Sequence, residues 1–370
     1  MPLLTFQERL PPDELVGSLS RKRILLSTLS MQQGNGGVCT VARMTAAALS
    51  QHHHVTAISC QDTGDYVVGD IAVRSYSDHR LRFVLANAAE TARASHVIYD
   101  HAGTARAHLN TLFWRRPYAL WLHGWEIWER PPLKYVWAVE RASILLANSA
   151  YTAERAQQIT KGRHVVTCPL GTPTDEEPVH VGPSPGPPTL MLIGRADELF
   201  AKGHDLLIEI WPNVVAAIPD AHLVFVGGGS ALDRVRRLAA ASPARDTIEI
   251  AGFVAEERLE SYWQRTTVFA MPGFAEGFGL VYIDAMRHGI PVIASTEDGG
   301  QEVNRHGITG FNIARSDKST LTEAIVCLLS DRDTASRLGS AGHDLWRAQY
   351  RRTDFERRLI TGLDDFLRAA

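Results

Sequence analysis

The sequence has few cysteines, no long apolar run and no start typical of a secreted protein. Its four cysteines are scattered without the spacing of metal ligands, so we expect free buried thiols in a reducing cytoplasm. No apolar run approaches the roughly 20 residues that a membrane-spanning helix needs. The first residues carry neither a basic start nor an apolar core, and so do not resemble a secretion signal. We therefore expect a cytoplasmic protein.

A dinucleotide fingerprint is also missing. The first expected strand, Arg23–Leu29, runs into the glycine-rich loop Gln33–Gly37, but Gly-x-Gly-Gly does not match the pattern of NAD-binding folds. The next expected strand, His54–Ser59, ends without the acidic residue that would hold a ribose. A dinucleotide oxidoreductase is therefore disfavoured. We interpret Gly36 and Gly37 as a place where a substrate approaches the backbone closely.

Composition and charge suit a globular protein with two uneven halves. With 370 residues, 45% of them apolar and 21% charged, the chain is long enough for two domains with substantial cores. Residues 1–170 hold 18 Lys and Arg against 13 Asp and Glu, whereas residues 171–370 hold 20 against 28. The basic first half suggests an anionic partner, such as a membrane surface or a phosphorylated acceptor, and chance is the open alternative for so small an excess. We expect no nucleic-acid partner.

Strand and helix patterns alternate on both sides of a proline-rich segment. Residues 171–188 contain six prolines and little apolar periodicity, which predicts a linker. Alternation of this kind predicts parallel sheets covered on both faces, here two α/β domains of similar size with a cleft between them. One of the expected helices is Thr104–Phe113. The expected strands are Arg23–Leu29, His54–Ser59, Ile71–Ser75, His96–Asp100, Tyr118–Leu122, Ile144–Ala147, His164–Thr167, Thr189–Ile193, His222–Val226, Ile248–Ala251, Val268–Met271 and Pro291–Ala294.

The chemistry of the chain centres on the stretch from Met271 to Asp298. A strand ends at Pro272, the glycine turn Glu276–Gly279 follows, and a helix is expected from Leu280 to His288. A glycine turn that opens a helix exposes unpaired N–H groups at the positive end of the helix dipole, which suits a phosphate. Glu276 and Asp284 lie eight residues apart on one helix face, where they could hold sugar hydroxyls and a ribose diol. A helix cap and a solvated acid remain the alternative.

Further candidates follow other strands. His123 comes just after Tyr118–Leu122, where it could bind a sugar hydroxyl or transfer a proton near neutral pH, or simply cap the loop. Arg195 and Lys202 flank the first turn of the second domain, and together with the turn at Glu276 they form a plausible diphosphate clamp. Either cation alone would be an ordinary surface residue. The backbone at Phe253 and Val254 could read a nucleobase edge.

Three segments carry a resemblance to a known family. GRADELFAKGHD, the stretch from Gly252 to Ser295, and DGGQEVNRHGITGF look like the C-terminal half of family 4 retaining glycosyltransferases of GT-B fold. The similarity covers nearly all of residues 189–315. These residues most resemble bacterial hexosyltransferases, often mannosyltransferases, of exopolysaccharide and glycolipid assembly. In the first half it is limited to short matches at Gly36-Gly37, His123-Gly124 and Asn148-Ser149.

The resemblance implies a fold and a domain plan. The fold is α/β of the GT-B type, with two Rossmann-like, doubly wound domains that face each other across a cleft. Residues 1–170 would form the acceptor-binding domain, 171–188 the linker and 189–352 the domain that binds the nucleotide-sugar donor. Residues 353–370 would be a C-terminal helix that crosses back to the first domain.

The resemblance also implies a role for each site residue. His123 and Glu276 would be catalytic, beside the donor sugar, and Asp284 stands where the family has a second glutamate for the ribose, one methylene shorter. The remaining assignments are Arg195, Lys202, Gly279 and Leu280 to the diphosphate, Gly277 and Phe278 to the sugar, Phe253, Val254 and Asp284 to the nucleobase and ribose, and Gly36 and Gly37 to the acceptor side.

The implied reaction is retaining hexosyl transfer from a nucleoside diphosphate sugar, of GDP-mannose or UDP-glucose type, to a saccharide or lipid-linked acceptor. We expect no metal, because no Asp-x-Asp pair lies near the predicted site, and no cofactor apart from the sugar nucleotide as co-substrate. Contact with the inner face of the cell membrane would fit a lipid-linked acceptor. A phosphorylase, a nucleotide-sugar epimerase and a non-catalytic sugar-nucleotide-binding protein on the same fold remain alternatives.

Overall fold

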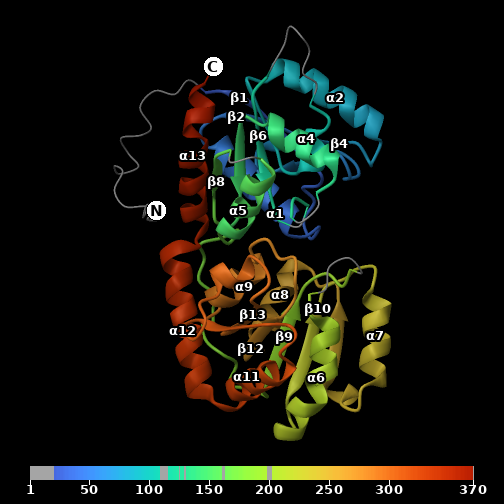
Figure 1. Ribbon diagram of the computed structural model, residues 1–370, viewed down its shortest axis with the longest axis vertical. Coiled ribbons are helices and arrows are strands. Elements are labelled where there is room, and N and C mark those ends of the chain that lie inside the picture. The colour runs from blue at the N-terminus through green and yellow to red at the C-terminus, as the bar shows by residue number, and fades with distance from the viewer. Residues whose placement is uncertain are drawn as a thin grey trace.

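Two α/β lobes, each built on one sheet, make up the protein (Figure 1). The computed structural model describes residues 21–108, 116–124, 126–128, 131–160, 163–197 and 202–369. The N-terminal lobe contains an 8-stranded sheet and the C-terminal lobe a 6-stranded one. The four cysteines are free, three of them buried and Cys327 partly exposed.

The sheet of the N-terminal lobe has the order β3-β4-β2-β1-β5-β6-β7-β8, and only the pair β3–β4 is antiparallel among its described pairings. Its strands are β1 Arg23–Thr28, β2 His54–Ser59, β3 Tyr66–Val68, β4 Ile71–Ser75, β5 His96–Tyr99, β6 Tyr118–Leu122, β7 Ile144–Ala147 and β8 Val165–Thr167. Its helices are α1 Gly37–Ser50, α2 Arg80–Arg93, α3 Ala102–Ala105, α4 Leu133–Arg141 and α5 Ala150–Ile159.

Continuous apolar runs explain the inner strands of this sheet. All five residues of β6 are buried, as expected for a parallel strand that is covered on both faces. Successive side chains of β1 enter different cores: Ile24 packs in one cluster with Val41 of α1, and Leu25 packs in the other with Phe83 of α2. The helices therefore cover the sheet from both sides.

The sheet of the C-terminal lobe has the order β11-β10-β9-β12-β13-β14, with parallel pairing throughout its described ladders. Its strands are β9 Thr189–Ile193, β10 His222–Val226, β11 Ile248–Gly252, β12 Val268–Met271, β13 Val292–Ser295 and β14 Gly310–Ile313. Its helices are α6 His204–Ala217, α7 Leu232–Ala241, α8 Glu256–Trp263, α9 Leu280–Arg287, α10 Gly300–Val303, α11 Lys318–Ser330 and α12 Arg332–Gln349, with a 3-10 turn at Arg245–Thr247. The strand order reverses between β9 and β12, the place where open α/β sheets bind ligands.

The chain crosses between the lobes at two neighbouring points. The Thr172 N–H donates to the Tyr350 carbonyl at 2.8 Å, which ties the segment after β8 to the end of α12. The last helix, α13 Arg352–Arg368, then packs against α1 and β7, and its Phe355 stacks on Trp121 of β6. Figure 1 shows α12 beside the C-terminal lobe and α13 beside the N-terminal lobe.

Several local expectations need correction. The helix expected at Thr104–Phe113 is the short α3, which starts at Ala102 and ends at Ala105, while residues 109–115 lie outside the described residues. The expected pattern also lacked β3, β14 and α10, elements of three or four residues. Segments this short contain too few residues to show a periodicity.

Candidate active site

The loops that follow the strands of the two sheets meet at the boundary between the lobes. His123 and Gly124 follow β6, and a Cβ atom placed on Gly277, which follows β12, would lie 2.7 Å from the carbonyl carbon of His123. Phe253 follows β11, and its ring would lie 3.1 Å from a Cβ atom on Gly34, which follows β1. The structure thus brings candidates from both halves of the chain together at the carboxyl ends of both sheets, where ligands bind in open α/β folds.

Two helix N-termini, one from each lobe, face each other at this boundary. Helix α1 begins after Gly36 and α9 begins after Gly279, with φ angles of 95° and 94°, a left-handed backbone that favours glycine. Neither of these described helices has a side-chain cap or an acidic residue in its first turn. A Cβ atom on Gly37 would lie 3.6 Å from Cδ1 of Leu280, so the two first turns are in contact. Their free N–H groups and helix dipoles form an anion site shared by the lobes.

Lys202 and Glu276 form an ion pair beside this anion site. Lys202 Nζ lies 2.7 Å from Glu276 Oε2, and the two side chains are only 17% and 22% exposed. The stem of Lys202 passes over Gly194, where a Cβ atom would lie 3.4 Å from Lys202 Cγ. The pair joins the loop after β9 to the loop after β12. The residue predicted to bind the diphosphate, Lys202, therefore lies beside the residue predicted to bind the sugar, Glu276.

Arg195 has a different partner. Its Nε donates to Asp197 Oδ2 at 2.8 Å, and Asp197 also accepts the backbone N–H of Ser230 at 3.0 Å. The hydrogen bond from Arg195 holds the pKa of Asp197 below its usual range. The Arg195 side chain is 59% exposed, and its Cδ lies 4.0 Å from the Cβ position of Gly36, so the stem of the side chain passes close to the start of α1.

The backbone of Glu276 is held by the segment after β13. The Glu276 N–H donates to Asp298 Oδ2 at 3.1 Å, and the Gly299 N–H donates to the Glu276 carbonyl at 2.8 Å. Ala275, just before Glu276, has a left-handed φ of 67°, which is unfavourable for alanine. Asp298 is fully buried, and burial together with the charge of Glu276 raises its pKa to about 7. Asp298 was not among the residues predicted from the sequence, because its bond to Glu276 joins residues that lie 22 positions apart.

His123 is fixed in one tautomer by its neighbours. Its Nε2 lies 2.6 Å from the carbonyl oxygen of Asp100, so Nε2 carries the proton and Nδ1 remains a hydrogen-bond acceptor. Its own carbonyl accepts a bond from Asn148 Nδ2 at 3.0 Å. Burial lowers the pKa of His123 to about 3, so the ring is neutral at physiological pH. Of the three roles that the sequence left open, this disfavours proton transfer, whereas a hydrogen bond to a hydroxyl and a loop-capping role both agree with a neutral ring.

Two buried acids hold the glycine loop after β1. The Asp100 carboxylate accepts the Leu29 N–H at 3.0 Å, and burial raises its pKa to about 8. Asp62 accepts the Met31 N–H at 2.7 Å and the Tyr66 hydroxyl at 2.5 Å. These supports of the Gly36–Gly37 loop were not found in the sequence, because Asp100 lies 71 residues from Leu29 and Asp62 lies 31 residues from Met31.

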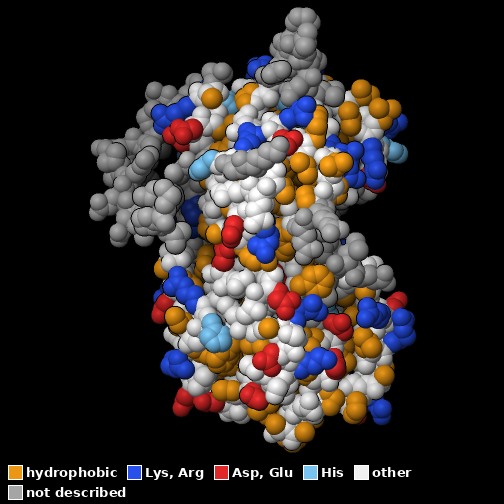
Figure 2. All heavy atoms as spheres, viewed as in Figure 1, with side chains coloured by type: hydrophobic (Ala, Val, Ile, Leu, Met, Phe, Trp, Pro, Cys, Tyr) orange, Lys and Arg blue, Asp and Glu red, His pale blue; other side chains and the backbone are white. Residues whose placement is uncertain are grey.

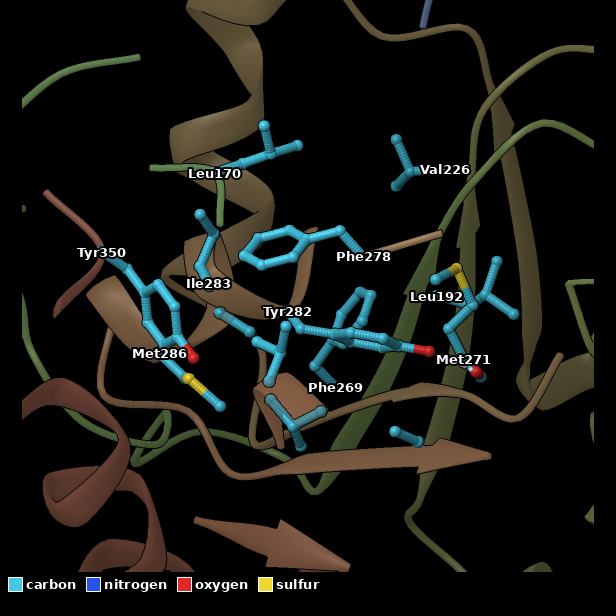
Figure 3. Packing of buried hydrophobic residues seen from close by; sticks show 14 of the residues in the cluster. Leu170, Leu192, Val226, Phe269, Met271, Phe278, Tyr282, Ile283, Met286 and Tyr350 are labelled. Carbon is cyan, nitrogen blue, oxygen red and sulfur yellow. Dashed lines mark hydrogen bonds between the residues drawn. The ribbon is translucent and has the colours of Figure 1, made fainter. Parts of the chain in front are cut away.

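The other predicted site residues divide by burial. Phe253 is 67% exposed, whereas Val254 is buried. Phe278 is buried and packs against Tyr350, with its ring among the labelled core residues in Figure 3. Only the backbone of Phe278 is therefore available to a ligand. The Asp284 carboxylate accepts a bond of 3.3 Å from Arg287 of its own helix and is one-third exposed. Among the described residues, no three His, Cys, Asp or Glu side chains gather in the manner of metal ligands.

The family of the C-terminal half follows from comparison with known proteins. Residues 174–344 match the family model described as Glycosyl transferases group 1. This chain carries a glycosyl transferases group 1 domain. A GDP-mannose-dependent alpha-(1-6)-phosphatidylinositol monomannoside mannosyltransferase of Mycobacterium tuberculosis is 34% identical over 188 residues, which cover 49% of this chain and 47% of that protein. The chain spans about half the length of the curated relatives it matches.

Solved structures identify the fold. Sucrose-phosphate synthase from Thermosynechococcus elongatus superposes with a TM-score of 0.79 at 20% identity, covering 95% of this chain and 100% of that one. HepE of Anabaena, in complex with UDP and glucose, superposes with a TM-score of 0.74 at 16% identity, covering 93% and 100%. These likenesses, together with the two parallel sheets, confirm the predicted GT-B fold. The described residues contain no helix that is long and apolar enough to cross a membrane.

Proposed function

We propose that this protein is a retaining glycosyltransferase that moves a hexose from a nucleoside diphosphate sugar to a hydroxyl group of a saccharide or lipid-linked acceptor. One observation carries the proposal. The first turns of α1 and α9 converge at the lobe boundary beside Lys202, Arg195 and Glu276. Two helix N-termini and two cations suit the charge of a diphosphate, and a carboxylate next to them suits the hydroxyls of a sugar.

The proposed mechanism follows from the charges that develop during the reaction. Breaking the bond between the anomeric carbon and the phosphate builds negative charge on the diphosphate and positive charge on the sugar ring. Lys202, Arg195 and the two helix N-termini stabilise the diphosphate, and the loss of one such donor typically lowers kcat by about 100- to 1,000-fold. The leaving phosphate oxygen accepts the proton of the attacking hydroxyl on the same face of the sugar. This route requires neither a side-chain nucleophile nor a metal.

The ion pair between Lys202 and Glu276 connects binding to chemistry. A diphosphate that engages Lys202 competes with Glu276 for the ammonium group, whose partner lies 2.7 Å away. Glu276 then becomes free to accept hydrogen bonds from the hexose hydroxyls. Neutral His123 has an acceptor at Nδ1, and its backbone carbonyl lies against Gly277 of the same loop. The two groups that the sequence assigned to catalysis thus come from opposite lobes.

Relatives indicate the class of donor. The mycobacterial relative is named as GDP-mannose-dependent, and HepE was also solved in complex with UDP-glucose. A thermal-shift panel of GDP, UDP, GDP-mannose and UDP-glucose, with and without EDTA, tests both the donor and the metal-independent route. A ligand at a hundred times its Kd stabilises the folded state by about 2.7 kcal/mol. If no nucleotide raises the melting temperature, the proposed donor site is wrong.

Variants test the site itself. We expect Glu276→Ala and Lys202→Ala to abolish transfer while the circular dichroism spectrum is retained. Lys318→Ala is a matched control, because Lys318 forms an exposed ion pair with Glu209 in the same lobe. Full activity in either site variant would refute the assignment. Product analysis with added phosphate, and without acceptor, separates transfer from phosphorolysis and epimerisation.

Helix α2 has an exposed surface that suits contact with a membrane, where a lipid-linked acceptor would lie. Leu81 and Leu85 are 73% and 61% exposed, one turn apart on α2, and Arg80 and Arg82 are exposed beside them. Figure 2 shows hydrophobic and basic side chains together over the α2 region at the upper right. Exposed leucines with basic side chains beside them suit a membrane that carries anionic lipids. The name of the mycobacterial relative, which includes a phosphatidylinositol acceptor, agrees with a lipid-linked substrate.

Sedimentation with vesicles tests this surface. We expect binding to phosphatidylglycerol-containing vesicles at low salt and weaker binding to pure phosphatidylcholine. The double variant Leu81→Gln and Leu85→Gln should reduce binding, whereas Leu238→Gln, at an exposed leucine of the other lobe, should not. Equal sedimentation with and without anionic vesicles would remove the membrane from the proposal.

A further inference from the structure

A five-residue segment, Asp298 to Glu302, connects the floor of the site in the C-terminal lobe to the N-terminal lobe. It follows β13 and includes the first turn of α10. Its first residue contacts the backbone of Glu276, and its last residue contacts the start of α5 in the other lobe. The same short segment therefore touches the candidate catalytic loop and the lobe boundary.

At its first end, the segment binds both backbone polar groups of Glu276, the N–H and the carbonyl. Asp298 Oδ2 accepts the Glu276 N–H at 3.1 Å, and the Gly299 N–H donates to the Glu276 carbonyl at 2.8 Å. A Cβ atom on Gly299 would lie 2.7 Å from the carbonyl carbon of Gly277, so only glycine permits this approach. These bonds help to hold Ala275 in its left-handed conformation.

At its other end the segment completes the cap of a helix in the opposite lobe. The Glu302 carboxylate accepts the backbone N–H of Ala150 at 2.9 Å and that of Tyr151. The next N–H of α5, that of Thr152, is bound by Ser149. A helix leaves its first N–H groups without partners inside the helix, and a carboxylate there is also favoured by the helix dipole. Two of the first three N–H groups of α5 thus depend on the C-terminal lobe.

Between its ends the segment is braced. Oδ1 of Asp298 accepts the Gly300 N–H at 3.0 Å, and Gln301 Nε2 donates to the carbonyls of Thr296 and Asp298 at 3.0 and 2.9 Å. A Cβ atom on Gly300 would lie 3.3 Å from Cζ of the Tyr282 ring, which leaves little room for movement against α9. A shift of Glu302 is therefore passed to Asp298 and not absorbed within the segment.

We propose that residues 298–302 couple closure of the two lobes to the placement of Glu276, with Asp298 and Glu302 as positioning residues at the two ends. Docking of Glu302 on α5 closes the lobe boundary and at the same time fixes the turn that presents Glu276. Opening of the lobes breaks this cap and releases the turn. The inference rests on the proposed transferase function only for the role of Glu276, because the mechanical coupling exists without it.

Hydrogen–deuterium exchange tests the coupling independently of activity. In the full-length protein, Glu302→Ala should speed exchange in the peptide that covers residues 272–280 by about tenfold or more, the size expected for loss of charge-assisted hydrogen bonds. Glu302→Gln, which keeps one acceptor oxygen, should give a smaller change. Glu323→Ala is the matched control, because Glu323 accepts a bond from Ser319 on its own helix α11. Unchanged exchange in Glu302→Ala would overturn the coupling.

Kinetics supply the second readout. Glu302→Ala and Asp298→Ala should each lower kcat more than they change the donor KM, and Asp298→Asn, which keeps an acceptor oxygen, should restore part of kcat. The loss in the double variant should be smaller than the product of the two single losses, because both act through Glu276. Losses that multiply independently would overturn the proposal. Absence of transfer in the wild-type protein would instead refute the proposed function, while the exchange experiment would still decide the coupling.

Discussion

Replacing Gly277 with alanine tests whether the two lobes must touch at the candidate site. A Cβ atom at this position would lie 2.7 Å from the carbonyl carbon of His123 and 2.8 Å from Asn148 Nδ2, and nearer still to the carbonyl oxygen of His123. Both contacts belong to the N-terminal lobe. The φ angle of Gly277 lies outside the left-handed region, so alanine meets a steric obstacle and no backbone strain.

The size of the effect follows from contact distances. Carbon atoms pack at about 3.5–4.0 Å, so the His123 carbonyl carbon alone requires the two backbones to separate by about 1 Å or more. A misplacement of about 1 Å between reacting groups lowers rates by about 100-fold. We therefore expect the variant to lose at least about two orders of magnitude in kcat/KM. Its melting temperature should change little, because the contact lies between the lobes and outside both cores.

Small-angle scattering and a transfer assay together check this reasoning. The Gly277→Ala protein should show a larger radius of gyration than the wild type, as well as the loss of transfer. Gly37→Ala is the steric control for scattering, because its Cβ atom would meet Leu280 Cδ1 at an ordinary distance of 3.6 Å and should leave the lobes closed. Wild-type transfer by Gly277→Ala would show that the lobes need not approach this closely during the reaction.

Three further outcomes are expected. Gly279→Ala combines a left-handed φ of 94° with a Cβ atom 2.5 Å from Cε2 of Tyr282, and should lower the free energy of unfolding in urea by roughly 1–3 kcal/mol; an unchanged midpoint would contradict this. The raised pKa of Asp298 means that the folded protein keeps a proton that the unfolded chain releases between about pH 4 and 7, so wild-type stability falls as pH rises through this window. Asp298→Asn should gain on the wild type there by up to about 1.4 kcal/mol per pH unit, and parallel stability curves would exclude the shift. Trp346→Phe removes the 2.9 Å bond to Thr172 at the lobe crossing and should cost at least about 0.5–1.5 kcal/mol in the same urea assay, because both residues are buried; an unchanged midpoint would contradict this.

Much of the fold was predictable because its signals are local. The strands Tyr118–Leu122 and Ile144–Ala147 were expected with their observed bounds, since each is a continuous apolar run that ends at polar or turn-forming residues. The glycine turn before α9 was also expected, and its helix ends one residue earlier than predicted. The GT-B fold followed from the resemblance of the C-terminal half. The roles assigned to the individual site residues stay predictions until binding or activity is measured.

The supports of the site were not predictable, because they depend on contacts between distant residues. Asp298 lies 22 residues from Glu276, and Glu302 lies 152 residues from Ala150. Nothing in the local sequence distinguishes a buried acid that binds a backbone N–H from an acid that faces solvent. The same holds for Asp100, whose carbonyl fixes the tautomer of His123 and whose carboxylate binds Leu29. Only the fold brings these groups within hydrogen-bonding distance.

The charges around Glu276 predict that the protonation of Asp298 changes when a diphosphate binds. Asp298 is buried beneath Glu276, whose negative charge raises the pKa of Asp298, while the nearby charge of Lys202 lowers it. A diphosphate that neutralises Lys202 removes the lowering influence and leaves the raising influence of the Glu276 charge on Asp298 unopposed. The pKa of Asp298 should then rise further above about 7, since like charges favour protonation of one partner.

Binding of a nucleoside diphosphate near neutral pH should therefore be accompanied by proton uptake at Asp298. Calorimetry at about pH 7.5 in two buffers of different ionisation enthalpy measures this directly, because the apparent binding enthalpy then depends on the buffer. The dependence should disappear in Asp298→Asn, which cannot take up the proton. A buffer-independent enthalpy in the wild type would mean that the diphosphate leaves Lys202 paired with Glu276, and the exchange of partners proposed for this site would be wrong.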